Sequence, residues 1–378
     1  MIEVQDIFNQ YGAEFLKDHT VSQAQLKALR DIERCRTAAL GGHAGICNEC
    51  GHQEVSYNSC RNRHCPKCQT IAKEQWIEKQ GLNLLNTGYF HVVFTIPKEL
   101  HTVMYQNQET MYKLFFTAVS QTLLELGMDS KYLGAKLGLT AVMHTWGQNL
   151  LFHPHIHCII PGGGLTPDNK WVFSRKKFFI PVKVLSKKFR GKFMALFRQA
   201  AVQFQGAISE LNIPGHFDLF ISALYKKDWV VYCKPPFKNA AKVIEYLGRY
   251  THRVAISNNR ILGLKDGYVT FKWRDYKDSS KVKTMTVSVM EFIRRFLMHV
   301  LPPGFHKIRH YGILASKDKS TRIALCKKLT DTPVSDVKPR NTLEILQDRL
   351  GINFNLCPKC GVGYMTRASP AYPNCIAA

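Results

Sequence analysis

The sequence predicts an α+β protein with a small metal-bound module near its N-terminus. Of its 378 residues, 45% are hydrophobic, which is enough for a sizeable core and excludes a disordered chain. Stretches rich in β-branched and aromatic residues alternate with stretches of helical period, as in mixed helices and strands. Residues 35–68 differ from both, because they are polar and rich in Gly, Asn, Cys and His.

The elements follow from local patterns along the chain. Apolar residues recur with a helical period in these ranges: 1–34 (one or two helices), 71–85, 110–126, 189–197, 239–251 and 290–300. Strands are expected at 89–97, 139–146 and 154–160, with a strand or hairpin at 219–233 and a hairpin around Lys265-Asp266-Gly267 at 261–275.

Charge and composition narrow the class of partner. The formal net charge is +24, which favours a polyanion such as nucleic acid. No run of about 18 apolar residues and no signal peptide is evident, so a cytoplasmic protein is expected. In that compartment the 12 cysteines are better interpreted as metal ligands or buried thiols than as disulfides. A phosphate-binding loop of the P-loop type is missing, which argues against ATP-driven work.

Two Cys-x-x-Cys pairs predict a zinc site. Cys47 and Cys50 are separated by 14 residues from Cys65 and Cys68, and two such pairs can complete a tetrahedral thiolate site. A second zinc site could use four nearby residues, namely Cys35, His43, Cys60 and His64. In the tail, Cys357, Cys360 and Cys375 give only three thiols, so a degenerate or incomplete knuckle is expected there.

A histidine-rich strand is the first candidate for a catalytic centre. Alternate residues of a strand share a face, so His155 and His157 should point together and could hold one divalent metal. His153 has the same parity and could add a ligand. His144 and His91, on the two earlier strands, are further candidates.

Two tyrosines and several cations mark a candidate nucleic-acid surface. Tyr246 and Tyr250 are spaced i, i+4, so they lie above one another on one helix flank, beside Arg249 and Arg253. Residues 169–209 contain no acidic side chain. Their candidate DNA contacts are Lys176, Lys177, Lys187 and Lys188. Phe178 and Phe179 could stack on bases, whereas Phe189 and Phe193 are expected to pack in the core.

These signals, in this order, resemble rolling-circle insertion-sequence transposases of the ninety-one family, in the HUH endonuclease superfamily. The resemblance rests on Ser59 to Gln69 (S-C-R-N-R-H-C-P-K-C-Q), His153 to His157 (H-P-H-I-H) and Tyr246 to Arg253 (Y-L-G-R-Y-T-H-R). It implies a central antiparallel sheet flanked by helices, with the histidines on a middle strand and the tyrosines on a helix beside it. It divides the chain into a helical, zinc-binding domain at 1–85, a catalytic domain at 86–315 and a basic tail at 316–378.

The resemblance also implies the chemistry. A tyrosine would attack single-stranded DNA at a transposon end or target, form a 5′-phosphotyrosine and leave a free 3′-OH. His155 and His157 would help to hold Mg²⁺ or Mn²⁺, and two tyrosines would permit two successive strand transfers. The third metal ligand varies in this superfamily and cannot be placed from the sequence.

Two alternatives remain open at this point. A non-catalytic zinc-containing DNA-binding protein would use the His and Tyr motifs only for packing. A tyrosine recombinase would form a 3′-phosphotyrosine without a metal. Nicking assays with Mg²⁺, chelator sensitivity and the polarity of the covalent bond separate the three.

Overall fold

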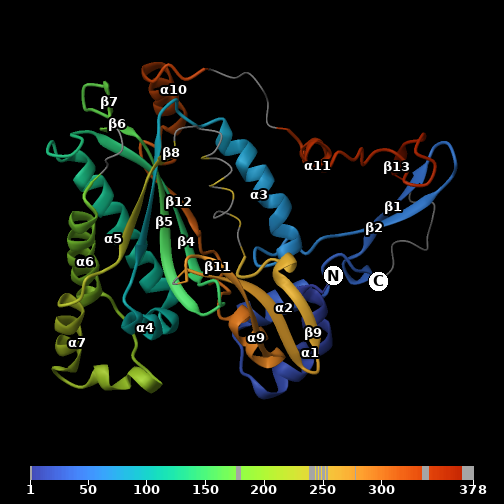
Figure 1. Ribbon diagram of the computed structural model, residues 1–378, viewed down its shortest axis with the longest axis horizontal. Helices are drawn as coiled ribbons and strands as arrows, with labels where there is room; N and C mark the ends of the chain where they lie inside the picture. Colours follow the sequence, from blue (N-terminus) through green and yellow to red (C-terminus); the bar gives the residue numbers. More distant parts are fainter. Residues whose placement is uncertain are drawn as a thin grey trace.

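A computed structural model of the chain describes residues 2–175, 180–237, 243, 246, 248, 252, 254–276, 278–333 and 340–367. It confirms the α+β class, since helices flank a curled antiparallel sheet (Figure 1). In the described part of the chain, no helix is both long and apolar enough to span a bilayer. Short 3₁₀ helices lie at Ala38–Leu40, Lys98–Leu100, Gly206–Asn212 and Asn258–Arg260.

The central sheet places the histidine strand in its middle. Its strands are β3 (Tyr89–Thr95), β4 (Lys136–Trp146), β5 (Phe152–Pro161), β6 (Gly163–Leu165), β7 (Trp171–Phe173), β8 (Val231–Phe237) and β12 (Ile308–Gly312). They follow the order β7-β6-β4-β5-β3-β8, with β12 also paired to β4. Because β5 hydrogen-bonds β4 on one side and β3 on the other, its backbone is fixed along both edges.

One face of this sheet is covered by helices and forms the main core. The covering helices are α4 (His101–Gln106), α5 (Gln108–Met128), α6 (Val182–Gln199) and α7 (His216–Tyr225). Phe94 of β3 and Ile156 of β5 are buried against them, and the rings of Phe94 and Phe189 lie 5.1 Å apart. Phe189 and Phe193 are therefore core residues, as expected. The histidines of β5 alternate with these buried residues and so point to the opposite face.

A second core joins distant parts of the chain. It contains α1 (Val4–Asp18), α2 (Gln23–Glu33), β9 (Ile261–Lys265), β10 (Tyr268–Asp275), β11 (Lys281–Ser288) and α9 (Val289–Leu297). Phe8 and Phe296 meet edge to face at 5.2 Å. The predicted hairpin turns at Asp266 and Gly267, whose φ angles are 50° and 75°, as a tight two-residue hairpin requires.

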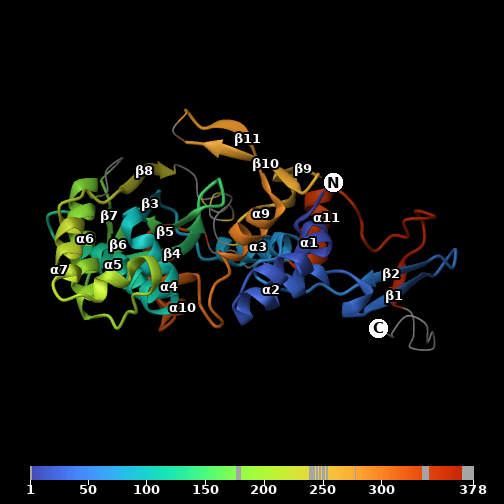
Figure 2. The ribbon, with the colours of Figure 1, turned by 90° about the horizontal axis from the view of Figure 1, so that it is seen from below.

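The remaining elements extend from these cores. They are β1 (Gly42–Cys47), β2 (Gln53–Tyr57), α3 (Pro66–Gly81), α10 (Lys319–Leu329), α11 (Thr342–Leu350) and β13 (Met365–Arg367). β1 pairs with both β2 and β13, so the tail adds a strand to the N-terminal hairpin. Figure 2 shows this small sheet at the end of the molecule away from α6 and α7.

Several expectations about elements need correction. Residues 219–233 are the end of helix α7 followed by β8, not a strand or hairpin. The reason is visible in the apolar spacing of Phe217, Phe220, Ile221 and Leu224, which has a helical period. The tail carries α10 and α11, which were not predicted. Most of the expected helix at 239–251 lies outside the described residues, although Val243, Tyr246 and Gly248 are helical.

Candidate active site and metal centres

A cluster of three histidines lies on the sheet face opposite α5 and α6. His144 of β4 faces His155 of the neighbouring β5, and His157 follows two residues later on the same face. One ring nitrogen from each lies within 4.8 Å of the others. His144 and His157 are nevertheless buried, so the cluster does not lie fully open on that face. Three imidazoles this close can bind one divalent metal. His144 is therefore a candidate for the third ligand, which the sequence alone could not place.

Hydrogen bonds orient two of these rings. The Nδ1 of His155 lies 2.7 Å from the backbone carbonyl of His153. Because a carbonyl only accepts, Nδ1 carries the proton and Nε2 is the nitrogen suited to a metal. The Nδ1 of His157 lies 2.9 Å from the Nε2 of His91. His153 contributes its carbonyl here, and its imidazole lies outside the three-histidine cluster, contrary to one expectation.

His91 connects this cluster to a candidate nucleophile. Its Nδ1 is 2.9 Å from the hydroxyl of Tyr246, and the two rings meet edge to face at 5.0 Å. Burial, with Lys234 and His155 adding to it, lowers the pKa of His91 to about 3, so the ring stays neutral. A hydrogen-bonded line therefore runs from Tyr246 through His91 to His157. The register that joins β3 to β5 was needed to see it.

Lys234 of β8 brings a cationic side chain close to this line. Its Nζ lies 5.5 Å from the centre of the Tyr246 ring, within range of a cation–π interaction. Sequence reasoning did not identify this lysine, because Lys-Pro-Pro in a strand carries no specific signal. It brings positive charge to the face where a phosphate would have to approach Tyr246.

Of the DNA-contacting residues expected from the sequence, those that the structure describes lie away from the histidines. Lys187 and Lys188 belong to α6, which packs on the sheet face opposite the histidines, and Lys188 pairs with Glu125 at 3.0 Å. The remaining predicted contacts and the second tyrosine lie outside the described residues; these are Lys176, Lys177, Phe178, Phe179, Arg249, Arg253 and Tyr250.

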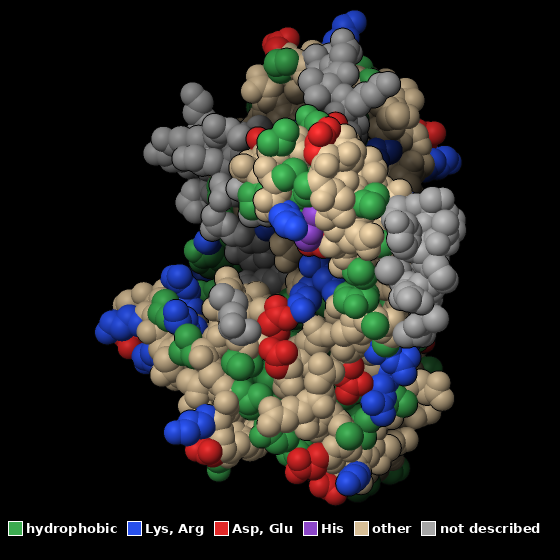
Figure 3. Space-filling model, turned by 90° about the vertical axis from the view of Figure 1, so that its right-hand side faces the viewer, with side chains coloured by type: hydrophobic (Ala, Val, Ile, Leu, Met, Phe, Trp, Pro, Cys, Tyr) green, Lys and Arg blue, Asp and Glu red, His purple; other side chains and the backbone are tan. Residues whose placement is uncertain are grey.

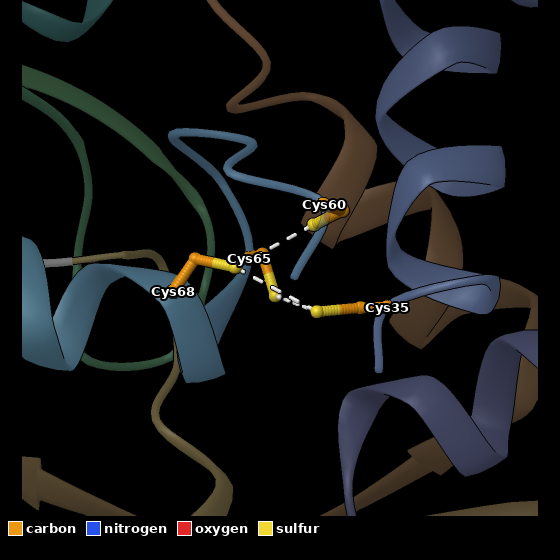
Figure 4. Close-up of side chains that lie close together, drawn as sticks. All are labelled: Cys35, Cys60, Cys65 and Cys68. Atoms are coloured by element: carbon orange, nitrogen blue, oxygen red, sulfur yellow. Dashed lines mark hydrogen bonds between the residues drawn. The ribbon is translucent and has the colours of Figure 1, made fainter. Parts of the chain in front are cut away.

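One cysteine cluster joins α2 to α3 through the loop between them. Its members are Cys35, Cys60, Cys65 and Cys68 (Figure 4). The Sγ of Cys68 lies 3.6 Å from those of Cys35 and Cys60, and the Sγ of Cys65 lies 3.6 Å from that of Cys35. A disulfide would need about 2.05 Å. Four sulfurs placed about 2.3 Å from a tetrahedral zinc would lie about 3.8 Å apart, which matches. Hydrogen bonds from Cys60 and Cys65 lower the pKa of the Cys35 thiol to about 7.

The expected grouping of zinc ligands is therefore wrong. Cys47 and Cys50 do not join Cys65 and Cys68, because the β1–β2 hairpin separates the two pairs in space.

The second cluster draws on the tail. Cys47 meets Cys360 and Cys50 meets Cys357, each with Sγ atoms 3.7 Å apart. The tail pair is thus part of a complete set of four thiols rather than a degenerate knuckle. Cys375 lies outside the described residues.

Neither expected histidine ligand belongs to these two clusters. His64 is half-buried by exposed area, and its Nε2 accepts a hydrogen bond from the backbone N–H of Leu301 at 3.3 Å. Desolvation of the ring holds its pKa well below the usual range. His43 lies on β1, outside the groups of converging ligands among the described residues.

Comparison with known proteins gives consistent matches. A family described as "Putative transposase" matches residues 138–321, and one described as "Transposase zinc-binding domain" matches residues 7–96. The chain is 46% identical over 373 residues to "Putative transposase y4qJ" of Sinorhizobium fredii, covering 96% of this chain and 94% of that protein. It is 26% identical over 321 residues to "Transposase for insertion sequence element IS801" of Pseudomonas savastanoi, covering 82% and 75% respectively. No solved structure matches the chain.

Proposed function

Because the chain belongs to the ninety-one family of insertion-sequence transposases, we propose that it cuts and rejoins single-stranded DNA through a tyrosine linked covalently to the 5′-phosphate. Tyr246 is the proposed nucleophile, and His144, His155 and His157 are the proposed ligands of a divalent metal. The observation that carries the proposal is the hydrogen-bonded line from the Tyr246 hydroxyl through His91 to His157.

The line sets the proton arrangement around the nucleophile. If His157 binds metal through Nε2, its Nδ1–H donates to the Nε2 of His91. The neutral His91 then carries its proton on Nδ1 and donates it to the Tyr246 oxygen. His91 thereby favours the phenolate and orients it, which makes it a positioning residue rather than the proton acceptor.

The proposed step is an in-line displacement at phosphorus. The Tyr246 hydroxyl loses its proton to solvent and its oxygen forms a bond to the 5′-phosphate. The bond from phosphorus to the 3′-oxygen breaks, and that oxygen takes a proton from solvent and leaves as a 3′-OH. Metal bound to the three histidines would polarise the phosphate as a Lewis acid. Attack of a 3′-OH on the phosphotyrosine reverses the step, so ligation requires no nucleotide cofactor.

The ligand set bears on which metal is used. Mg²⁺ prefers oxygen ligands, whereas imidazoles suit transition metals better. An all-histidine protein set therefore favours Mn²⁺ over Mg²⁺, with phosphate and water oxygens completing the shell. We propose zinc for the cluster of Cys35, Cys60, Cys65 and Cys68, where it would hold α2 against α3.

Further parts of the proposal extend the family resemblance. Tyr250 would carry out the second of two strand transfers, with Arg249 and Arg253 contacting phosphates. The domain limits of 1–85, 86–315 and 316–378 remain proposals, as does action in the cytoplasm. In the second core the first two helices pack against residues 255–300, which ties the proposed N-terminal domain to the catalytic domain.

The test is detection of the covalent adduct. The protein is incubated with oligonucleotides of transposon-end sequence, labelled at the 5′ or 3′ side of the cut, and Mn²⁺ or Mg²⁺ is added. Mass spectrometry should find the 3′-side fragment attached to Tyr246 or Tyr250 through its 5′-phosphate. Tyr246→Phe should reduce or redirect the adduct, whereas Tyr268→Phe, at an exposed tyrosine of β10, should not change it.

Variants of the histidines test the metal. His144→Ala, His155→Ala and His157→Ala should each abolish metal-dependent cutting and leave DNA binding intact, whereas His216→Ala at the exposed start of α7 should cut normally. DNA binding without an adduct under any metal would instead favour a non-catalytic zinc-containing DNA-binding protein. A 3′-phosphotyrosine formed without metal would favour the recombinase mechanism.

A further inference from the structure

Two turns at opposite ends of the sequence have the same construction. Each is a Cys-x-x-Cys-Gly segment, and the glycines Gly51 and Gly361 have φ angles of 67° and 68°. The N–H of Gly51 donates to the carbonyl of Cys47 at 3.2 Å, and the N–H of Gly361 donates to that of Cys357 at 2.9 Å. A residue with a Cβ is disfavoured at such angles, so glycine is needed to close both turns.

Backbone amides in both turns point at the sulfurs. The N–H of Glu49 donates to the Sγ of Cys47 and that of Lys359 to the Sγ of Cys357, each at 3.4 Å. The N–H of Gly363 donates to the Sγ of Cys360 at 3.3 Å. Donors of this kind stabilise thiolates, which are the form that binds metal.

The tail is seated closely on the N-terminal hairpin. Met365 of β13 pairs with Cys47 of β1. The N–H of Tyr364 donates to the side-chain oxygen of Asn48 at 2.7 Å. A Cβ on Gly363 would lie 2.5 Å from the Sγ of Cys47, so only glycine allows this approach.

This end of the molecule has almost no apolar core of its own. All five residues of β2 are exposed, and Val362 and Tyr364 of the tail are 73% and 54% exposed. Figure 3 views the molecule from this end and shows hydrophobic side chains scattered among charged ones on the surface. Burial of apolar area therefore cannot account for the ordered turns, and a different source of stability is required.

We propose that Cys47, Cys50, Cys357 and Cys360 bind a second zinc ion, which fastens the C-terminal segment to the N-terminal hairpin. Sulfurs 3.7 Å apart fit a tetrahedral site of four thiolates, as in the first cluster. Two of its four ligands, Cys357 and Cys360, lie outside the zinc-binding domain that the family comparison matches, because that match ends at residue 96. It is also independent of the strand-transfer chemistry proposed above.

The zinc would make the tail a strap across α3. Upstream of the tail cysteines, Arg340 pairs with Glu78 of α3 at 2.9 Å, and the side-chain amide of Gln75 donates to the hydroxyl of Thr342 at 2.6 Å. These contacts are exposed and weak individually. Fixing the far end of the segment through metal keeps them in place by raising their effective concentration.

The test combines metal content with protease sensitivity of the full chain. Elemental analysis should find two zinc equivalents in the wild type and one in the double variant Cys357→Ser/Cys360→Ser. Cys326→Ala, at a buried cysteine of α10 outside both clusters, should retain two. The double variant should also be cut by trypsin at Lys359 or Arg367 at least tenfold faster than the wild type, with cutting of the central sheet unchanged.

Two results would overturn the proposal. One is that the double variant holds as many zinc equivalents as the wild type. The other is that wild type and double variant are cut in the tail at the same rate. Because neither measurement involves DNA cleavage, the outcome does not depend on the proposed tyrosine chemistry.

Discussion

Gly248 lets the helix that carries Tyr246 approach α3 closely. A Cβ built on Gly248 would lie 2.2 Å from the Cδ1 and 2.8 Å from the Cγ1 of Ile77. Ordinary carbon contacts begin near 3.4 Å. Replacing Gly248 with Ala therefore creates an overlap between two helices directly beside the proposed nucleophile.

The cost of Gly248→Ala depends on whether the Ile77 side chain or the helix moves to relieve the overlap. Ile77 is β-branched and on a helix, where one χ1 rotamer is strongly preferred, so its Cγ1 cannot turn aside at low cost. The Cδ1 of Ile77 can rotate away about χ2, so the overlap that remains is that of Cγ1, and the helix must shift outward by about 0.6 Å (3.4 − 2.8). Overpacking costs about 1–3 kcal/mol, and the better helix propensity of Ala returns up to about 1 kcal/mol, so the net loss of stability should be small. A misplacement of about 1 Å at a reacting group costs roughly 100-fold in rate, so this smaller shift should cost about 10-fold or more.

The assay compares single-turnover DNA nicking with thermal unfolding. Gly248→Ala should slow adduct formation by about 10–100-fold while changing the free energy of unfolding by less than about 2 kcal/mol. Gly191→Ala is the matched control, because it lies in the middle of α6 with nothing within 4 Å of the added Cβ. Ile77→Ala combined with Gly248→Ala should restore much of the rate. Wild-type nicking by Gly248→Ala, or failure of the double variant to recover, would refute the reasoning.

Further predictions concern protonation and charge. His91→Phe removes both hydrogen bonds of the line. Nicking by Tyr246 should therefore fall by roughly 10–100-fold with DNA binding unchanged, because a hydrogen bond to a charged group is worth about 1.5–3 kcal/mol. An unchanged rate would exclude a positioning role for His91. Burial lowers the pKa of His299 to about 4, below its unfolded value of about 6.5. The unfolded chain therefore takes up this proton first, so the stabilisation is complete above pH 6.5 and is lost as the pH falls towards 4. It amounts to about 3 kcal/mol, and urea titrations of His299→Gln should show a shallower loss. Replacing Lys187 and Lys188 with Gln should reduce the slope of log affinity against log salt by about 1 for single strands; an unchanged slope would confine the DNA to the histidine face.

The strands of the site could be predicted because they carry strong local patterns. Runs of β-branched and aromatic residues located β3, β4 and β5 within a few residues, and alternation placed His155 and His157 on one face. What alternation cannot supply is register. The pairing of His144 with His155, and the side-chain contact of His91 with His157, depend on how the antiparallel strands are aligned. The sequence could therefore name His144 and His91 only as candidates. It could not show that His144 lies beside His155 or that His91 contacts Tyr246.

The cysteine pairing could not be predicted for a different reason. Spacing shows that Cys47/Cys50 and Cys65/Cys68 can each form a knuckle, but it does not show which knuckles meet. The answer depends on the direction of the β1–β2 hairpin and on a tail about 300 residues away in sequence. Each Cys-x-x-Cys pair supplies only two of four ligands, so a pair considered alone looks incomplete. The pair of Cys357 and Cys360 looked incomplete in the sequence for this reason.

The two faces of the central sheet would serve different needs of the proposed reaction. On one face, large buried side chains from α5 and α6 hold β3, β4 and β5, so the proposed metal ligands are placed by rigid backbone. On the other face, a small cluster among the described residues has Tyr89, Ile159 and Val243 as its buried members, and Tyr246 packs against it. A nucleophile that becomes covalently attached to DNA must later present that DNA to a second strand. Because the proposed ligands lie on these β-strands and the proposed nucleophile lies on a separate element, in the proposed reaction Tyr246 would be able to withdraw with its attached strand without moving the metal ligands.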